Sequence, residues 1–181
     1  MKSFPNIMPH LHLSLQSGSD AILKKMNRQY TVRDFLKSIE NINLQLDRPA
    51  ITTDIIAGFP GETTQDFAQS LSVAKLAGFS KIHIFPFSKR KGTAAEKLQG
   101  HINKEVITQR VLMLRELEKQ LAGKFRKQFI GEAAQVLIED EVKKSGKCER
   151  YYEITLQTDK PVEKGEIVNC KISNEGVGNR V

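Results

Sequence analysis

The chain has 181 residues, and its 28 basic residues outnumber its 21 acidic residues, which gives a net charge of +7. This length allows one medium domain, or one domain with a small module. The ordinary share of apolar residues argues against wholesale disorder, and the apolar runs are far shorter than the ~20 residues that span a bilayer.

The N-terminus has no charged-then-apolar signal pattern, so we expect a cytoplasmic protein with no membrane partner. The chain has two cysteines, Cys148 and Cys170. They are too few for a disulfide scaffold, a four-cysteine zinc site or a three-cysteine iron–sulfur motif within this chain.

The first hundred residues alternate strand patterns with helix patterns. Strands are predicted over residues 11–15, 51–57 and 81–87. The helices between these strands have capping residues at Ser19, Thr31 and Thr63. Such alternation is typical of a parallel α/β sheet, in which ligands bind at the carboxyl ends of the strands. The polar turns after the three strands are therefore expected on one rim.

A long amphipathic helix is predicted next, beginning after Asn103. Its apolar stripe consists of Ile107, Val111, Leu114, Leu117, Leu121 and Phe125. Arg110 and Lys119 are expected on the opposite, solvated side. From residue 132 the pattern changes to short strands, which are predicted over 134–138, 151–156 and 167–172. Gly146, Pro161, Gly165 and Gly176 separate these strands, and the pattern favours a small antiparallel barrel.

The first predicted strand has polar side chains along one face. Its members are His10, His12, Ser14 and Gln16. This polar face either lines a pocket or belongs to a half-exposed strand with its polar side in water. The His10-x-His12 spacing also suits a metal, but two histidines without further ligands are a weak signal.

Asp54 lies within the second predicted strand, where a carboxylate is costly unless it is paired. It either binds a ligand or forms an interior salt bridge. The turn from Gly58 to Glu62 could approach a ligand closely, or could be an ordinary connection to the next helix. Glu62 argues against phosphate there, although helix starts often bind anions.

The loop Lys89-Arg-Lys91 could contact phosphate or simply be solvated. Composition and spacing taken alone therefore predict a rim site and a small barrel, without naming a reaction.

Longer motifs resemble a known family. The segment His10-Leu-His-Leu-Ser-Leu-Gln-Ser-Gly-Ser-Asp20 and the segment Arg28-Gln-Tyr-Thr31 resemble the fourth-strand region of radical S-adenosylmethionine tRNA methylthiotransferases. Thr53-Asp-Ile-Ile-Ala-Gly-Phe-Pro-Gly-Glu-Thr63 resembles the fifth strand of that family. His83-Ile-Phe-Pro-Phe-Ser-Lys-Arg-Lys-Gly-Thr93 resembles its sixth strand. The last ~50 residues resemble the TRAM domain, a small barrel associated with RNA binding.

The resemblance implies a fold and a division into parts. The fold is α/β, the C-terminal half of a radical SAM partial (β/α)6 barrel followed by an all-β TRAM barrel. Residues 1–100 would form the half-barrel, 101–130 a connecting helix, and 131–181 the TRAM-like RNA-binding barrel.

The resemblance also implies an activity. The family adds a methylthio group to C2 of adenosine 37 in tRNA, using S-adenosylmethionine and [4Fe–4S] clusters. The first motif is most similar to the enzymes that act on N6-threonylcarbamoyladenosine. The cluster-binding cysteines of the family are absent from this sequence, so we expect the chain to be inactive alone and to contain no metal site.

Two groups of residues are carried over as site candidates. The S-adenosylmethionine candidates are Gln16, Ser17, Asp54, Gly58 and Glu62. The candidates for contact with RNA are Arg90, Lys91, Lys143, Lys144 and Lys147. The expected partner is the anticodon stem-loop of tRNA, and no DNA partner is expected. Residues 131–181 contain ten acidic and eight basic residues, which is an unfavourable balance for RNA outside a local basic patch.

Two alternatives remain open beside the enzyme fragment. The chain could be a stand-alone tRNA- or RNA-binding module, which predicts RNA affinity that falls steeply with salt. It could also be one half of a split enzyme, which predicts a cysteine-rich partner chain.

Overall fold

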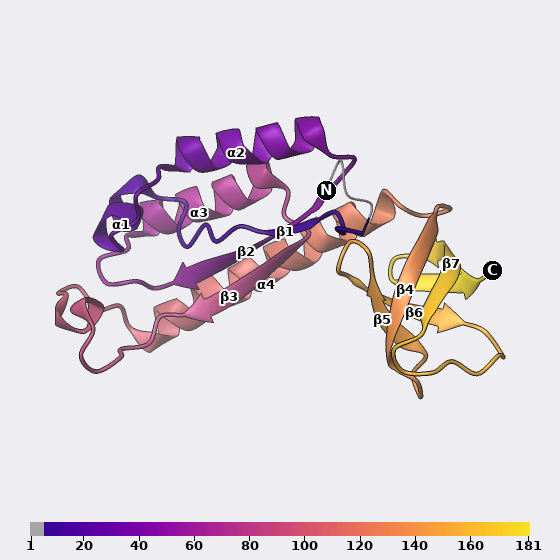
Figure 1. The fold of residues 1–181 in the computed structure, drawn as a ribbon. Coiled ribbons are helices and arrows are strands. Elements are labelled where there is room, and N and C mark those ends of the chain that lie inside the picture. The colour runs from indigo at the N-terminus through magenta and orange to yellow at the C-terminus, as the bar shows by residue number, and fades with distance from the viewer. Residues whose placement is uncertain (1–5) are drawn as a thin grey trace. The chain divides into compact units, whose positions relative to one another are not determined.

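The computed structural model describes residues 6–181 (Figure 1). Residue contacts divide the chain into two compact units. The α/β unit consists of His12–Gln45 and Ile51–Ala122. The barrel unit consists of the described residues 6–11, Leu46–Ala50 and Gly123–Val181.

A three-stranded sheet organises the first half of the chain, with the strand order β1-β2-β3. The strands are β1 (His10–His12), β2 (Ala50–Ala57) and β3 (Lys81–Pro86). β2 and β3 are parallel, which confirms the predicted parallel arrangement. β1 is shorter than predicted because its pairing to β2 continues only through separate hydrogen bonds, such as Leu13 N–H to the Thr52 carbonyl.

The helices begin where the capping residues predict. They are α1 (Asp20–Lys25), α2 (Val32–Gln45), α3 (Thr64–Ala77), the 3₁₀ helix η1 (Ala94–Lys97) and α4 (Lys104–Lys127). Thr63 and Asp66 form a reciprocal capping box at the start of α3. α3 ends at Gly78, whose φ of 65° is the left-handed conformation that glycine adopts most easily.

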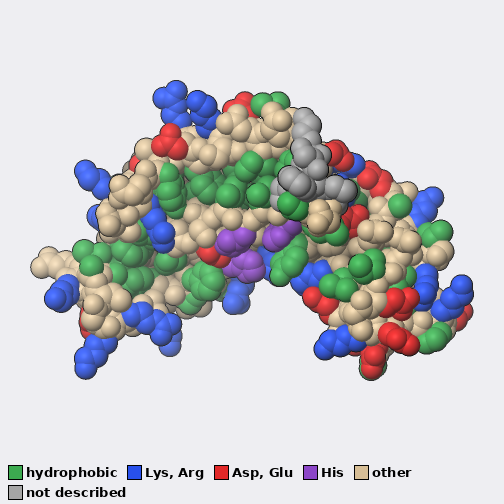
Figure 2. Space-filling view, viewed as in Figure 1, with side chains coloured by type: hydrophobic (Ala, Val, Ile, Leu, Met, Phe, Trp, Pro, Cys, Tyr) green, Lys and Arg blue, Asp and Glu red, His purple; other side chains and the backbone are tan. Residues whose placement is uncertain are grey.

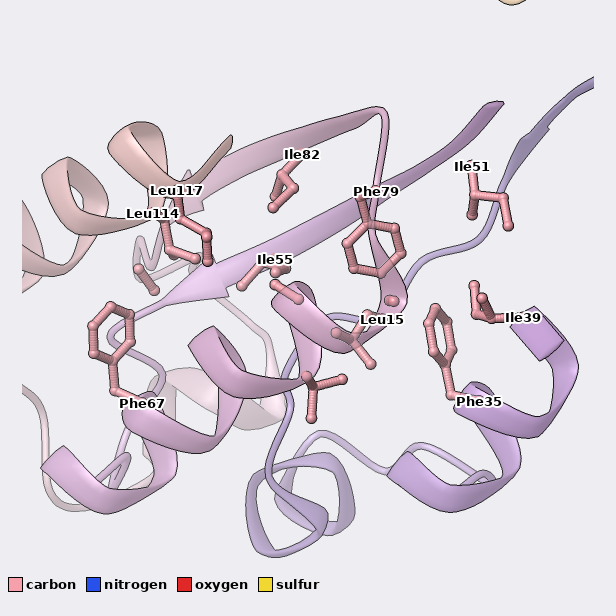
Figure 3. Close-up of a cluster of buried hydrophobic side chains, with 14 of the residues drawn as sticks. Leu15, Phe35, Ile39, Ile51, Ile55, Phe67, Phe79, Ile82, Leu114 and Leu117 are labelled. Carbon is pink, nitrogen blue, oxygen red and sulfur yellow. The ribbon is translucent and has the colours of Figure 1, made fainter. Parts of the chain in front are cut away.

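The α/β unit has its hydrophobic core on one face of the sheet (Figure 3). The strands and their connections contribute Leu15, Ile51, Ile55, Phe79 and Ile82. The helices contribute Phe35, Ile39, Phe67, Leu114 and Leu117, and α2 and α3 run side by side along the sheet in Figure 1. Because strand residues alternate between faces, Thr52, Asp54 and His83 lie on the face opposite this core.

The barrel unit contains a closed five-stranded barrel with the order β4-β5-β6-β8-β7. Its strands are β4 (Ala133–Asp140), β5 (Ser145–Cys148), β6 (Glu153–Gln157), β7 (Ile167–Asn174) and β8 (Val177–Arg180). The sequence predicted three of these strands and missed β5 and β8, which have only four residues each. β8 pairs in parallel with β6. The prediction of an antiparallel barrel is therefore wrong for this pair of strands.

Gly146 was predicted to separate strands, and this prediction is wrong because Gly146 lies inside β5. A Cβ atom there would overlap the Leu137 carbonyl of β4. Glycine therefore permits the close approach of these two strands.

The barrel interior is apolar and fully buried. Its core includes Val136, Ile138, Ile154, Leu156, Val168 and Cys170. Phe125 and Phe129, from the end of α4 and the following turn, join the same core. Within residues 6–181, no helix is long and apolar enough to cross a membrane.

Candidate functional site

A row of hydrogen-bonded polar side chains crosses β1 and β2 on the face opposite the helices. Ser14 donates from Oγ to Asp54 Oδ2 over 2.8 Å, and His12 Nε2 lies 3.0 Å from the same oxygen. His12 Nδ1 lies 3.0 Å from Thr52 Oγ1. The predicted polar face of the first strand therefore meets the predicted face of Asp54. We call these four residues, with His83 beside them, the polar row.

Asp54 is held as a carboxylate by its neighbours. Partial burial acts to raise its pKa, but hydrogen bonds from Ser14 and His12 outweigh burial, so the pKa lies below its ordinary value. His83 is aligned with Asp54 across the β2–β3 ladder, and its ring centroid is 5.7 Å from that of His12. Figure 2 shows histidine side chains gathered on one face of the molecule. Asp54 thus has polar neighbours rather than a simple two-residue salt bridge.

A pocket of about 430 Å³ adjoins the polar row at the carboxyl ends of the strands. Its walls are Gln16, Asp54, Ile56, Phe59, Phe85, Pro86, Phe87, Ser88, Arg90, Thr93 and Ala95. The three turns predicted to share one rim all contribute to this pocket. Phe59 and Phe87 contact each other edge-to-face, with ring centroids 5.4 Å apart. The pocket therefore combines flat apolar walls with a carboxylate, an amide and a guanidinium.

Gln16 is placed in the pocket by an unusual backbone conformation. Its φ is +66°, which is uncommon for a residue with a side chain. Its N–H donates to the Asp54 carbonyl, and its own carbonyl accepts from the Ile56 N–H. These two bonds to β2 hold the strained residue in place, and the residue is 8% exposed.

Ser17 lies in the same turn but has a different set of contacts. Its Oγ accepts from the Ser19 N–H and lies 3.4 Å from Ser70 Oγ of α3. A Cβ atom on the neighbouring Gly18 would approach the Ser70 backbone within 2.5 Å. Ser17 and Gly18 therefore pack the turn against α3, and neither is among the described residues that line the pocket.

Gly58 and Glu62 form a buried link between the β2–α3 turn and α4. Glu62 Oε2 accepts from the Gly58 N–H over 2.8 Å and from Arg110 Nη1 over 2.6 Å. Arg110 also donates to the Glu62 carbonyl and packs over the Phe67 ring. The Glu62 and Arg110 side chains are 1% and 8% exposed. Among the described residues, Glu62 Oε1 has no hydrogen-bond partner.

Arg110 corrects the sequence analysis, which expected it on the solvated side of α4. The helical pattern missed it because a buried arginine differs from a surface arginine only through a distant partner, which for Arg110 is Glu62. Burial raises the pKa of Glu62 above its ordinary value, against the opposing effects of the Gly58 N–H and Arg110. This link shapes the turn that bears Phe59.

The basic residues proposed to contact RNA differ in their positions and in their partners. Arg90 lines the pocket, whereas the adjacent Lys91 does not, within the described residues. In the barrel unit, Lys143 pairs with Asp140 at 3.4 Å and Lys147 pairs with Glu139 at 3.7 Å. Lys144 donates from Nζ to the Thr158 carbonyl over 2.7 Å. These lysines cluster around the β4–β5 hairpin, as their sequence positions predict.

The described residues do not fit an iron–sulfur cluster or another metal centre. Cys148 and Cys170 are both buried in the barrel unit. Burial raises the pKa of the Cys170 thiol to about 11, which disfavours the thiolate that binds metals. Within residues 6–181, no group of three or more His, Cys, Asp or Glu side chains is arranged to hold a metal ion.

Comparisons with known proteins agree with the motifs. Residues 2–74 match the Radical SAM superfamily. The chain is 38% identical, over 97% of its length, to a threonylcarbamoyladenosine tRNA methylthiotransferase, MtaB, of Thermotoga maritima. It is 37% identical, over 96% of its length, to a tRNA-2-methylthio-N(6)-dimethylallyladenosine synthase of Streptomyces griseus. The chain is thus similar to radical SAM tRNA methylthiotransferases. The resemblance of the motifs to tRNA methylthiotransferases is thereby confirmed.

The relationship does not separate the two kinds of methylthiotransferase, because the identities are nearly equal. A third relative, a tRNA-2-methylthio-N(6)-dimethylallyladenosine synthase of Thermodesulfovibrio yellowstonii, is 38% identical over 96% of the chain. The chain spans less than half of each relative. It covers 41% of the Thermotoga protein, 36% of the Streptomyces protein and 40% of the Thermodesulfovibrio protein.

Proposed function

We propose that this chain forms part of a transferase that adds a methylthio group to C2 of N6-threonylcarbamoyladenosine 37 in tRNA. In this proposal the α/β region is the C-terminal half of a partial (β/α)6 barrel. Residues 131–181 are a TRAM-like module that binds the anticodon stem-loop. We retain residues 1–100, 101–130 and 131–181 as the functional division, and the cytoplasm, where tRNA is modified, as the location.

The rim pocket is the observation that carries this proposal. Phe59, Phe85 and Phe87 offer apolar surface on which an adenine ring can pack. Gln16 and Asp54 offer the amide and carboxylate that can hydrogen-bond to its polar edge or to a ribose. Adenosine occurs both in S-adenosylmethionine and in the target nucleotide, and both are reactants of the proposed transfer.

The polar row favours the threonylcarbamoyl substrate over the dimethylallyl one. A dimethylallyl group is purely apolar, whereas a threonylcarbamoyl group has a hydroxyl, a urea and a carboxylate. Ser14, His12 and His83 supply hydrogen-bonding groups on the face that adjoins the pocket. Arg90 supplies a cation at the pocket wall. A threonylcarbamoyl carboxylate could pair with the Arg90 guanidinium at the pocket wall, whereas a dimethylallyl group offers that cation no acceptor.

The remaining candidates have supporting roles in this proposal. Glu62, with Arg110, would hold the Gly58 turn, and Ser17 would fix the turn that presents Gln16. Lys91, Lys143, Lys144 and Lys147 would contact the tRNA backbone. The chemistry attributed to [4Fe–4S] clusters needs cysteines that these 181 residues do not offer in a suitable arrangement, so we infer that they do not catalyse the transfer alone.

The test is the nucleoside composition of tRNA from cells that lack the protein. We expect loss of 2-methylthio-N6-threonylcarbamoyladenosine, accumulation of its precursor, and unchanged 2-methylthio-N6-dimethylallyladenosine. Restoring the intact gene should restore the product, and a gene with Arg90→Gln should restore much less than one with Lys37→Gln, a control on the exposed surface of α2. Loss of the dimethylallyl product instead would overturn the substrate assignment.

A further inference from the structure

The barrel unit has an apolar groove on its outer surface, separate from the rim pocket. It has a volume of about 310 Å³, near the lower end for small-molecule pockets. Leu137 of β4 and Ile167 of β7 line it and are 45% and 61% exposed. Tyr151 lies at the edge of the groove, in the hairpin between β5 and β6. Large apolar side chains that remain this exposed next to each other often mark a binding surface.

Tyr151 is held in a conformation that its own packing does not explain. Its φ is +63°, in the left-handed region that disfavours side chains, yet the residue is 51% exposed. Its N–H donates to the Cys148 carbonyl, and the Cys148 N–H donates to the Tyr152 carbonyl. The tight hairpin therefore fixes the ring at the surface. Strain maintained without burial points to a role in binding.

The surroundings of Tyr151 suit a flat ring near a negative charge. The His10 ring stacks on Tyr151 with a centroid separation of 4.4 Å and an interplanar angle of 12°. Lys147 Nζ lies 5.3 Å from the Tyr151 centroid. The two carboxylates of the groove have partners of their own, because Glu139 pairs with Lys147 and Glu149 accepts from the Gln135 N–H.

We propose that this groove holds one unpaired nucleobase of an RNA, stacked on Tyr151 in the place that the His10 ring occupies in this structure. The apolar side chains Leu137 and Ile167 would cover the base edge, and Lys147 would lie near the adjacent phosphate. An aromatic side chain with a nearby cation is the usual combination for binding single-stranded nucleic acid. This inference rests on the proposed function, because it takes tRNA as the partner.

The experiment measures binding of the whole chain to a labelled RNA stem-loop and to a fully paired RNA duplex, by fluorescence anisotropy over a range of salt concentrations. Tyr151→Gly is the decisive variant, because glycine accepts the positive φ and the hairpin should fold at least as well. Tyr151→Phe keeps the ring. Val142→Ala removes a side chain that is 88% exposed and does not line the groove, so it is the matched control.

We expect Tyr151→Gly to weaken stem-loop binding by about fivefold to a hundredfold, the range for loss of one base stack. Its salt dependence should not change, because stacking releases no counterions. Tyr151→Phe and Val142→Ala should bind like the wild type, duplex binding should be unaffected by Tyr151→Gly, and His10→Ala should bind at least as tightly.

Wild-type stem-loop affinity in Tyr151→Gly would overturn the inference, and so would an equal loss of duplex binding. If an apolar peptide occupied the groove instead, Tyr151→Gly would leave RNA binding intact. A wild-type chain that binds neither RNA would contradict the proposed RNA-binding role itself, which is a different result from failure of the groove alone.

Discussion

The sheet of the α/β unit and the barrel both alternate apolar and polar strand residues, but their polar faces have different surroundings. In the barrel, alternate residues of β4, such as Val136 and Ile138, fill a closed apolar interior. In the sheet, one face of β2 joins an apolar core through Ile51 and Ile55, while the other presents Thr52 and Asp54. The barrel thus divides its two faces between core and solvent, whereas the sheet keeps a polar face beside a pocket. In our proposal the sheet, with its polar face and pocket, binds adenosine, whereas the barrel binds the RNA around it.

The largest expected change in stability concerns the buried ion pair of the α/β unit. Arg110→Met leaves the Glu62 carboxylate buried without its cation, and we expect a loss of about 3–5 kcal/mol in the free energy of unfolding. Denaturant unfolding measures it. The double variant Arg110→Met with Glu62→Leu should recover most of the loss, since no charge remains buried. A double variant as unstable as the single one would show that packing, rather than charge, dominates.

The barrel should respond to apolar truncation instead. Ile154 is fully buried, so Ile154→Ala should cost about 2–5 kcal/mol through lost burial and a cavity. Ile167→Ala, on the barrel surface, is the control and should change stability by no more than about 0.5 kcal/mol. Thermal and denaturant unfolding both report these changes. Similar losses in the two variants would contradict the assigned burial.

A smaller effect is expected at the start of α3. Thr63→Ala removes a side chain that accepts from the Asp66 N–H, and this should cost about 1 kcal/mol. Thr108→Ala is the matched control, because Thr108 lies inside α4 and its hydroxyl only donates to the Lys104 carbonyl. Urea unfolding of both variants checks the difference. A larger loss in Thr108→Ala would argue against the capping box.

The smallest effect concerns Asp54 and its dependence on pH. The folded-state pKa lies below the ordinary value, so the ionised form stabilises the fold above the unfolded-state pKa, and this contribution is lost as the pH falls through the folded-state pKa. Asp54→Asn should therefore cost less than about 1 kcal/mol at neutral pH and nothing in strong acid. Unfolding of both proteins across pH tests this. A difference that grows in acid would reverse the sign of the proposed interaction.

The sequence predicted local features well because their causes are local. Ser19 and Thr63 cap helices through neighbours only three residues away. The alternation of Ile51 and Asp54 between two faces of β2 also follows from strand geometry alone. The same alternation placed His12 and Ser14 on one polar face, and the sequence left open whether that face lines a pocket or is half-exposed to water.

Features that depend on distant partners escaped the sequence analysis. The helical pattern predicts Arg110 as a surface arginine, because its partner Glu62 is 48 residues away in the sequence. The short strand β5 lacks an apolar alternation, because Gly146 is required for contact with Leu137 rather than for a turn. The positive φ of Gln16, which sets its place in the pocket, depends on its bonds to β2. Such pairings across the fold have no signature in a single segment.

The most direct test of the central claim is an NMR titration of the chain with N6-threonylcarbamoyladenosine and, separately, with N6-dimethylallyladenosine. We predict chemical-shift changes at the backbone amides of Gln16, Asp54, Phe59 and Arg90 that are saturable, stronger with the threonylcarbamoyl nucleoside, and reduced in Arg90→Gln but not in Lys91→Gln. Shift changes confined to the barrel, or a preference for the dimethylallyl nucleoside, would contradict the assignment of the rim pocket.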